Sequence, residues 1–175
     1  LENWMPGVEI IGEGLMVTLS EKELRKWEDK NDVQDRTKGV VSIWKEEEFS
    51  HTPMPNPRFL LLHTLSHILI KEISFNCGYS AASLRERIFC TTDDSTVSMA
   101  GILIYTGSSD TEGTMGGLSE QAETPRMAQL LLKAIDKSRW CSLDPVCREN
   151  IIIDENLNLA SCHGCTTISE TSCEY

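Results

Sequence analysis

Seven cysteines stand out in this chain of 175 residues, and four of them have the spacing of metal ligands. Five residues separate Cys141 from Cys147, two separate Cys162 from Cys165, and fourteen lie between the pairs. Two thiolates in a Cys-x2-Cys turn can both reach one ion at about 2.3 Å, and a second pair completes a tetrahedral site. The spacing predicts a structural zinc site formed by Cys141, Cys147, Cys162 and Cys165, with Cys173 as an alternative ligand.

Two other states of these cysteines stay open, namely buried thiols without a metal and disulfides. The gap of five residues in the first pair is longer than the usual two to four. The chain begins Leu-Glu-Asn-Trp, without a basic segment or an apolar run, and its odd number of cysteines fits poorly with complete pairing. We therefore expect a reducing, cytoplasmic location. Because the first residue is not Met, we also expect the chain to be part of a longer protein.

A second group of metal-binding side chains is His63-x3-His67, whose spacing puts two imidazoles on one face of a helix. Zinc proteases use this spacing, but Thr64 stands where their catalytic glutamate is needed. Helix packing is the simpler interpretation. The alternative is a second metal ion and, with it, a hydrolytic metalloenzyme that would add Asp110 and Glu112 from the glycine-rich loop at residues 107–117.

The charge of the chain limits its role with nucleic acids. It has 27 acidic and 16 basic residues, which gives a net charge of −11 with His neutral. A domain that binds DNA by itself usually carries an excess of Lys and Arg. We therefore expect DNA contact to be indirect or to need a partner. The arginines selected as contacts to nucleic acid or to that partner are Arg85, Arg87, Arg126 and Arg139.

Apolar periodicity predicts the elements that position these residues. Asn56 followed by Pro57 indicates the start of a helix that runs to residue 76, and its apolar residues cover most of its circumference, so it should be buried. Charged residues interrupt it too often for a membrane span. Residues 85–91 alternate like a strand, residues 100–106 form a continuous apolar run typical of a central strand, and residues 125–137 predict a second helix.

The N-terminal part gives weaker signals. Residues 8–11 and 15–19 predict two short strands joined by a glycine turn, and a capping-box pattern at Ser20 predicts a short helix to residue 27. Residues 28–38 show no apolar period, so we expect a surface loop there and a short strand at 40–44.

The fold class predicted is α/β (α+β), with a mixed sheet packed by two main helices over residues 1–139. A zinc knuckle over 140–175 should pack on this core as part of one domain.

Six motifs together resemble a known family. They occupy residues 6–14, 61–70, 77–88, 101–106, 112–118 and 160–165, in this order along nearly the whole chain. They are similar to the MrfA-type zinc-binding (MZB) domain, which accompanies superfamily 2 DNA helicases, and most of all to the form found in the DISARM anti-phage system.

The resemblance implies a non-enzymatic accessory domain with a structural Zn²⁺ at the four cysteines named above. It also implies a helicase partner, either a DrmA-like subunit or helicase domains in the same polypeptide, and an indirect role in engaging DNA. A DNA-repair helicase is the alternative context. The chain contains no P-loop of a helicase motor, so we assign it no ATPase activity, and we expect no membrane partner.

Overall fold

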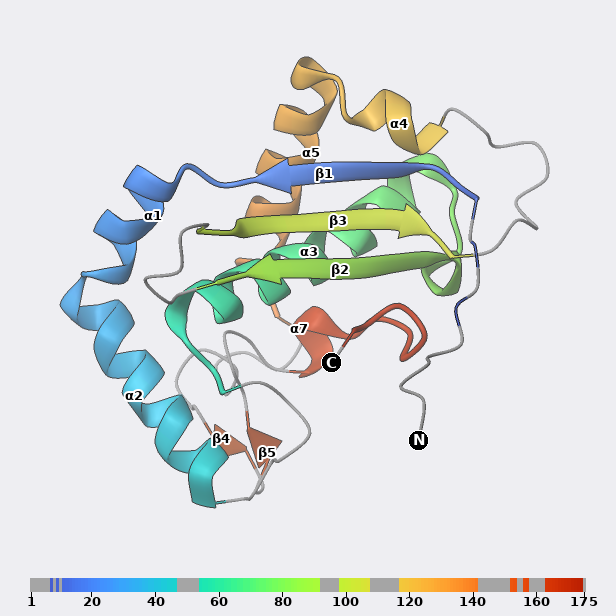
Figure 1. The fold of residues 1–175 in the computed structure, drawn as a ribbon. Coiled ribbons are helices and arrows are strands. Elements are labelled where there is room, and N and C mark those ends of the chain that lie inside the picture. The colour runs from blue at the N-terminus through green and yellow to red at the C-terminus, as the bar shows by residue number, and fades with distance from the viewer. Residues whose placement is uncertain are drawn as a thin grey trace, which may run out of the picture.

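The computed structural model describes residues 7, 9, 11–46, 54–91, 98–107, 117–141, 152–153, 156–157 and 163–174. Its main sheet has the strand order β1-β3-β2 (Figure 1). β3 (Ala100–Thr106) is the central strand and pairs antiparallel with β1 (Gly14–Thr18) and with β2 (Leu84–Cys90). The α+β class is thus confirmed. The prediction of a mixed sheet is wrong, because both strand pairs of the main sheet are antiparallel. β4 (Ile152–Ile153) and β5 (Asn156–Leu157) form a separate small pair.

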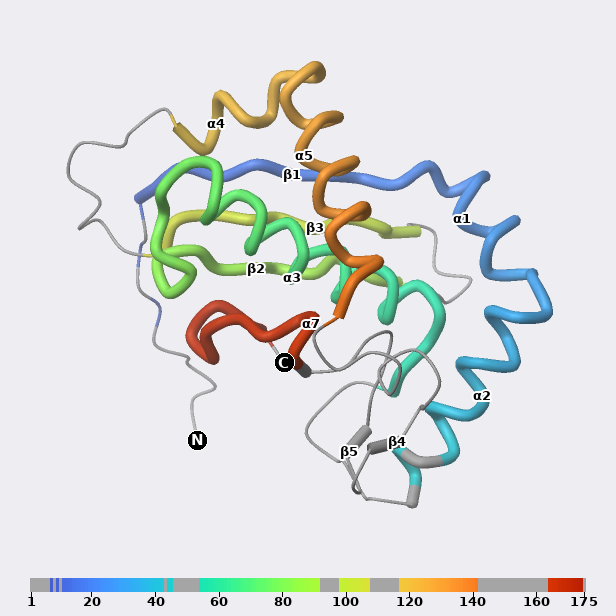
Figure 2. The backbone as a smooth tube through the Cα atoms, turned by 180° about the vertical axis from the view of Figure 1, so that it is seen from behind, coloured from blue at the N-terminus to red at the C-terminus, as the bar shows by residue number. Residues whose placement is uncertain are grey.

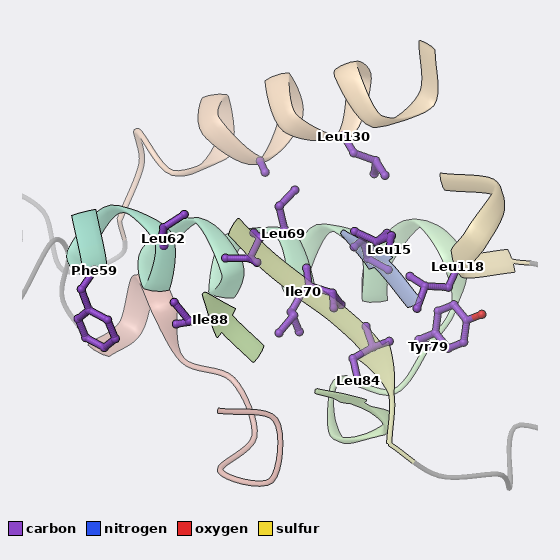
Figure 3. Close-up of a cluster of buried hydrophobic side chains, with 14 residues drawn as sticks. Leu15, Phe59, Leu62, Leu69, Ile70, Tyr79, Leu84, Ile88, Leu118 and Leu130 are labelled. Atoms are coloured by element: carbon purple, nitrogen blue, oxygen red, sulfur yellow. The ribbon is translucent and has the colours of Figure 1, made fainter. Parts of the chain in front are cut away.

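The long buried helix is confirmed as α3 (Pro57–Cys77), which covers one face of the sheet (Figures 1 and 2). The Asn56 side chain caps its N-terminus by accepting a hydrogen bond from the amide of Phe59 at 2.9 Å. Gly78 ends the helix with φ of 74°, a left-handed conformation that glycine adopts without steric cost. α3, the sheet and α5 share one core, whose labelled residues in Figure 3 include the fully buried Leu62, Leu69, Ile70 and Leu84. Ile102 and Ile104 of β3 are fully buried members of the same core.

The second main helix is also confirmed, as α5 (Thr124–Lys137), and it packs against α3 on the side away from the sheet (Figure 2). Leu130 and Ala134 are its buried residues. α4 (Gly117–Gln121) precedes it and buries Leu118, and a short 3-10 helix, η1 (Ala81–Ser83), joins α3 to β2. The layers are therefore sheet, α3 and α5, and the opposite face of the sheet carries no described helix (Figure 1).

The predictions for residues 28–44 are wrong. α1 (Glu21–Glu28) follows Ser20 as expected, but α2 (Asn31–Glu46) replaces both the predicted loop and the predicted strand. Val33, Thr37 and Val40 lie on one face of α2, where Val40 is fully buried and the Thr37 hydroxyl donates to the Val33 carbonyl at 2.8 Å. Because charged residues surround this narrow apolar stripe, the helical period is weak in the sequence.

The first strand expected, at residues 8–11, is not formed by the residues that the structure describes there, Glu9 and Ile11, and the others lie outside the described ranges. β1 begins only at Gly14, after the glycine turn. The second of the two predicted strands is therefore confirmed, with bounds shifted by one residue toward the N-terminus.

A buried arginine connects α1 to α3. Arg58, 3% exposed, lies 2.8 Å from Oε1 of Glu21 and 2.9 Å from Oε1 of Glu28. It also donates to the carbonyl of Thr91 and to the hydroxyl of Ser98, both at 2.9 Å. Hydrogen bonds from Arg58 and then from Arg25 lower the pKa of Glu21 to about 2. The guanidinium thus has carboxylate partners, as a buried charge requires.

The C-terminal segment lies along β2, one of the two edge strands of the main sheet. α7 (His163–Thr166) contacts α3, and the residues after it approach β2. The amide of Glu86 donates to the carbonyl of Ser172 at 3.0 Å, and the amide of Ile88 donates to the carboxylate of Glu174 at 2.8 Å. The segment therefore covers backbone groups that an edge strand would otherwise expose. Within the described ranges, no helix is both long and apolar enough to cross a membrane.

Candidate metal centre

Two imidazoles, a carboxylate and a thiol meet where α3, β2 and the C-terminal segment come together. The residues are His63 and His67 of α3, Glu86 of β2 and Cys173, and their ligand atoms all lie within 4.8 Å of one another. The Glu86 side chain has no exposed surface, and those of His63 and His67 are 15% and 12% exposed. We call these four residues the His-Glu-Cys cluster.

Local structure explains how each side chain of the cluster is positioned. His63 and His67 are one helical turn apart, and their rings meet edge to face with centroids 4.4 Å apart. Glu86 occupies an inward position of β2, between the buried Leu84 and Ile88, because alternate residues of a strand share one face. Cys173 is held near them because its two neighbours in the chain are bonded to β2.

The contacts within the cluster are short. Nε2 of His63 lies 3.3 Å from Sγ of Cys173 and 3.4 Å from Oε1 of Glu86. Nε2 of His67 lies 3.5 Å from the same Oε1. The other nitrogen of His67, Nδ1, is 2.7 Å from the carbonyl of Thr166. Because a carbonyl only accepts, Nδ1 must carry a hydrogen, and Nε2 is the nitrogen that faces the cluster.

Two polar atoms of the cluster are buried without a hydrogen bond among the described residues. They are Nε2 of His67 and Oε2 of Glu86. In a neutral His67, Nε2 would present a lone pair to the carboxylate, and two acceptors facing one another repel. A cation, either a proton or a metal ion, removes this conflict.

The side chains around the imidazoles favour positive charge. Burial lowers the pKa of His67, but Cys173 and Glu86 outweigh burial and raise that pKa to about 9. The same balance raises the pKa of His63. Burial would raise the pKa of Glu86, yet His63 and His67 hold it well below its usual value. The cluster is therefore a buried site in which a carboxylate stays ionised and a cation is needed.

Three members of this cluster can be identified as candidates from the sequence, although not as one group. His63 and His67 were predicted as a helix-packing pair or a second metal site, and Cys173 as an alternative ligand of the four-cysteine site. Glu86 was missed. The sequence contained a signal for it, because Glu86 stands at a position of the alternating strand where an apolar residue is expected. A carboxylate buried at such a position requires a positively charged partner.

The predicted four-cysteine site is only partly covered by the described residues. Cys147 and Cys162 lie outside them, as do Asp110 and Glu112 of the glycine-rich loop. Cys141 and Cys165 are described and half-buried, and the Cys165 carbonyl accepts a hydrogen bond from Lys71 of α3 at 2.7 Å. The ligand set Cys141, Cys147, Cys162 and Cys165 stays a prediction.

The four predicted contact arginines do not gather at one place. Arg85 and Arg87 belong to the outward positions of β2, on the sheet face opposite α3, and Arg87 pairs with Glu174. Arg126 lies in α5, which packs beyond α3, and Arg139 follows that helix. Both pair with acidic side chains nearby in sequence. The structure thus brings two of the four to one face, and their role as contacts stays a prediction.

Comparison with known sequences defines the family to which the chain belongs. The family profile of the MrfA Zn-binding domain (MZB) matches residues 65–166, more than half of the chain. The chain therefore belongs to the MZB family of zinc-binding domains.

A named relative adds the biological context. The chain is 35% identical over 179 residues to the DISARM protein DrmB of Bacillus paralicheniformis. This similarity covers 99% of the chain and 31% of the relative, so the chain spans less than a third of that protein's length. His63 and Cys173 lie outside the range that the MZB profile matches, so the family match does not assign the His-Glu-Cys cluster.

Proposed function

We propose that this chain is a non-enzymatic, zinc-binding accessory domain of a superfamily 2 DNA helicase complex in DISARM-like antiviral defence. The observation that carries the proposal is the MZB match over residues 65–166, a range that contains all four predicted zinc ligands. The similarity to DrmB supplies the defence context. Four thiolates leave no open coordination position for water or substrate, so this zinc is structural.

The zinc would fix the C-terminal knuckle on the core. Binding of a metal to ligands that are otherwise flexible contributes directly to folding free energy. The described contacts support this role, because His67 and Lys71 of α3 bond the carbonyls of Thr166 and Cys165 at one end of the ligand segment. We therefore assign residues 1–139 and 140–175 to one MZB domain, with the knuckle packed on the core.

The helicase partner is a DrmA-like subunit or helicase domains of the same polypeptide, and the complex works in the cytoplasm. The net charge of −11 favours DNA contact through this partner rather than through the domain alone. The sheet face opposite α3 has side chains that suit a direct contribution of this domain to DNA contact within the complex. It carries Arg85 and Arg87 beside Phe89 and Tyr105, and arginines with aromatic rings suit contact with single-stranded DNA.

The competing function, a hydrolytic metalloenzyme at His63 and His67, has less support. The cluster offers four protein ligand atoms that lie within 4.8 Å of one another. A zinc ion held by all four has no remaining position for a nucleophilic water, whereas catalytic zinc keeps one.

The test of the zinc assignment compares Cys162→Ser with Cys77→Ser, a matched change of a half-buried thiol at the end of α3. We expect Cys162→Ser to lose about one zinc per chain and to melt at lower temperature, and Cys77→Ser to keep its zinc. The proposal is wrong if Cys162→Ser retains the zinc content and melting temperature of the unchanged protein.

The test of DNA engagement is a salt series of DNA affinity, measured for the isolated chain and for its complex with the helicase. We expect steep salt dependence only for the complex, and a slope reduced by roughly 1 in Arg87→Ala. Arg25→Ala in α1 is the control. Strong, salt-dependent DNA binding by the isolated chain would contradict the proposal that DNA contact needs the helicase partner.

A further inference from the structure

We propose that His63, His67, Glu86 and Cys173 bind a zinc ion of their own, separate from the four-cysteine site. The inference goes beyond the proposed function, because it concerns different ligands and a second ion. Two of the four residues fall outside the family match, so it rests on the geometry of this chain.

The spacing of the ligand atoms suits a tetrahedral ion. Bonds of about 2.0 Å to nitrogen or oxygen and about 2.3 Å to sulfur place neighbouring tetrahedral ligands about 3.3–3.8 Å apart. The separations from Nε2 of His63 to Sγ of Cys173 and to Oε1 of Glu86 are 3.3 and 3.4 Å, and that from Nε2 of His67 to Oε1 is 3.5 Å. All four atoms lie within 4.8 Å of one another, so any separation at that upper limit must shorten by about 1 Å when the ion binds.

The buried polar atoms of the cluster also call for a cation. Among the residues that the structure describes, Nε2 of His67 has no hydrogen bond although it faces a carboxylate, and Oε2 of the same carboxylate has none either. A proton on His67 would satisfy one nitrogen. A metal ion would satisfy both imidazoles, the carboxylate and the thiolate at once.

The charge and softness of the donors favour Zn²⁺. One carboxylate and one thiolate balance a divalent ion, so the filled site is neutral, as a buried position favours. Two nitrogens, one oxygen and one sulfur form a mixed set that suits this borderline ion, whereas Mg²⁺ and Ca²⁺ prefer oxygen ligands alone.

Outer contacts already orient the ligands. Nδ1 of His67 donates to the Thr166 carbonyl at 2.7 Å, the arrangement that fixes the tautomer of metal-binding histidines. The amide of Glu174 donates to Oε1 of Glu86 at 3.1 Å and holds that carboxylate in place. The ion would join α3, β2 and the C-terminal segment, so its role is to fix that segment on the core.

The experiment measures zinc per chain by native mass spectrometry, after removal of metal and titration of the full chain with zinc sulfate. We expect two ions in the unchanged protein and one in His67→Ala and in Cys173→Ala. Cys90→Ala should keep both, since its thiol lies near Asn56 rather than in the cluster. Magnesium at the same concentration should not fill the site.

The outcomes separate the two proposals. If Cys162→Ser loses an ion while His67→Ala and Cys173→Ala lose none, the second site is wrong and the proposed function stands. If His67→Ala fails to fold, the ¹⁵N spectrum of the histidines in the unchanged protein decides. Zinc-dependent shifts of Nε2 in His63 and His67 support the site. A His67 that is a doubly protonated imidazolium with and without zinc overturns it.

Discussion

Glu86 and Glu174 are joined across the edge of β2: the amide of Glu174 donates to the carboxylate of Glu86 at 3.1 Å, while the carboxylate of Glu174 accepts from the amide of Ile88 at 2.8 Å. The same Oε1 of Glu86 faces both imidazoles of the cluster. The attachment of the C-terminal segment to β2 therefore also positions Cys173. A change at this edge should act on the segment and on the cluster together.

We expect Glu174→Ala to loosen the C-terminal segment. The change removes the acceptor of the Ile88 amide and the partner of Arg87, at a cost of about 1–2 kcal/mol. Hydrogen exchange of residues 163–174 should become faster, while exchange in β3 stays slow. Glu170→Ala, at an exposed position of the same segment, is the control. Equal exchange in both variants would show that this contact does not hold the segment.

We expect Arg58→Ala to destabilise the fold by about 3 kcal/mol in urea unfolding. The variant removes the buried partner of both the Glu21 and the Glu28 carboxylate. Arg25→Ala removes an exposed ion pair with the same Glu21 and should cost about 0.5 kcal/mol or less. Similar losses in the two variants would contradict a structural role for the buried network.

The pH dependence of stability should contain a contribution from Glu21. Because hydrogen bonds from Arg58 and Arg25 lower its pKa from the ordinary 4.5 to about 2, the folded state binds this proton less readily than the unfolded state. The stabilisation is complete above about pH 4.5 and is lost as the pH falls toward 2. Glu21→Gln should be less stable at neutral pH and lose less stability in this window. A curve parallel to that of the unchanged protein would contradict the assignment.

The core should respond to truncation at α3 more than at the outer surface of α5. Leu62→Ala removes a fully buried side chain and should cost about 3 kcal/mol. Leu132→Ala, at a position 69% exposed, should change stability by about 0.5 kcal/mol or less. Urea unfolding of both variants provides the comparison, and equal costs would place the core elsewhere.

The sequence predicted those elements whose signal is local. The Asn-Pro start, the apolar residues and the terminal Gly78 defined α3, and a continuous apolar run defined β3. α2 was missed because its described buried residues, Thr37 and Val40, form only a narrow stripe, and charged neighbours obscure the helical period. Its helical structure depends on packing against other helices, which the local pattern does not encode.

The candidate cluster was harder to predict, because its members are distant in sequence. His63 and His67 are detectable as a pair from their spacing on one helix. Their meeting with Cys173, 110 residues after His63, depends on the backbone contacts between β2 and the C-terminal segment. Glu86 joins them only because the register of the sheet turns its side chain toward α3.

The most direct test of a zinc-binding domain with two separate sites is X-ray absorption at the zinc edge of the zinc-saturated chain. A four-sulfur site together with the His-Glu-Cys cluster predicts an average of about 2.5 sulfur and 1.5 nitrogen or oxygen ligands per zinc. In His67→Ala the average should move to about four sulfurs. A spectrum without sulfur ligands, or a chain that binds no zinc, would contradict the account.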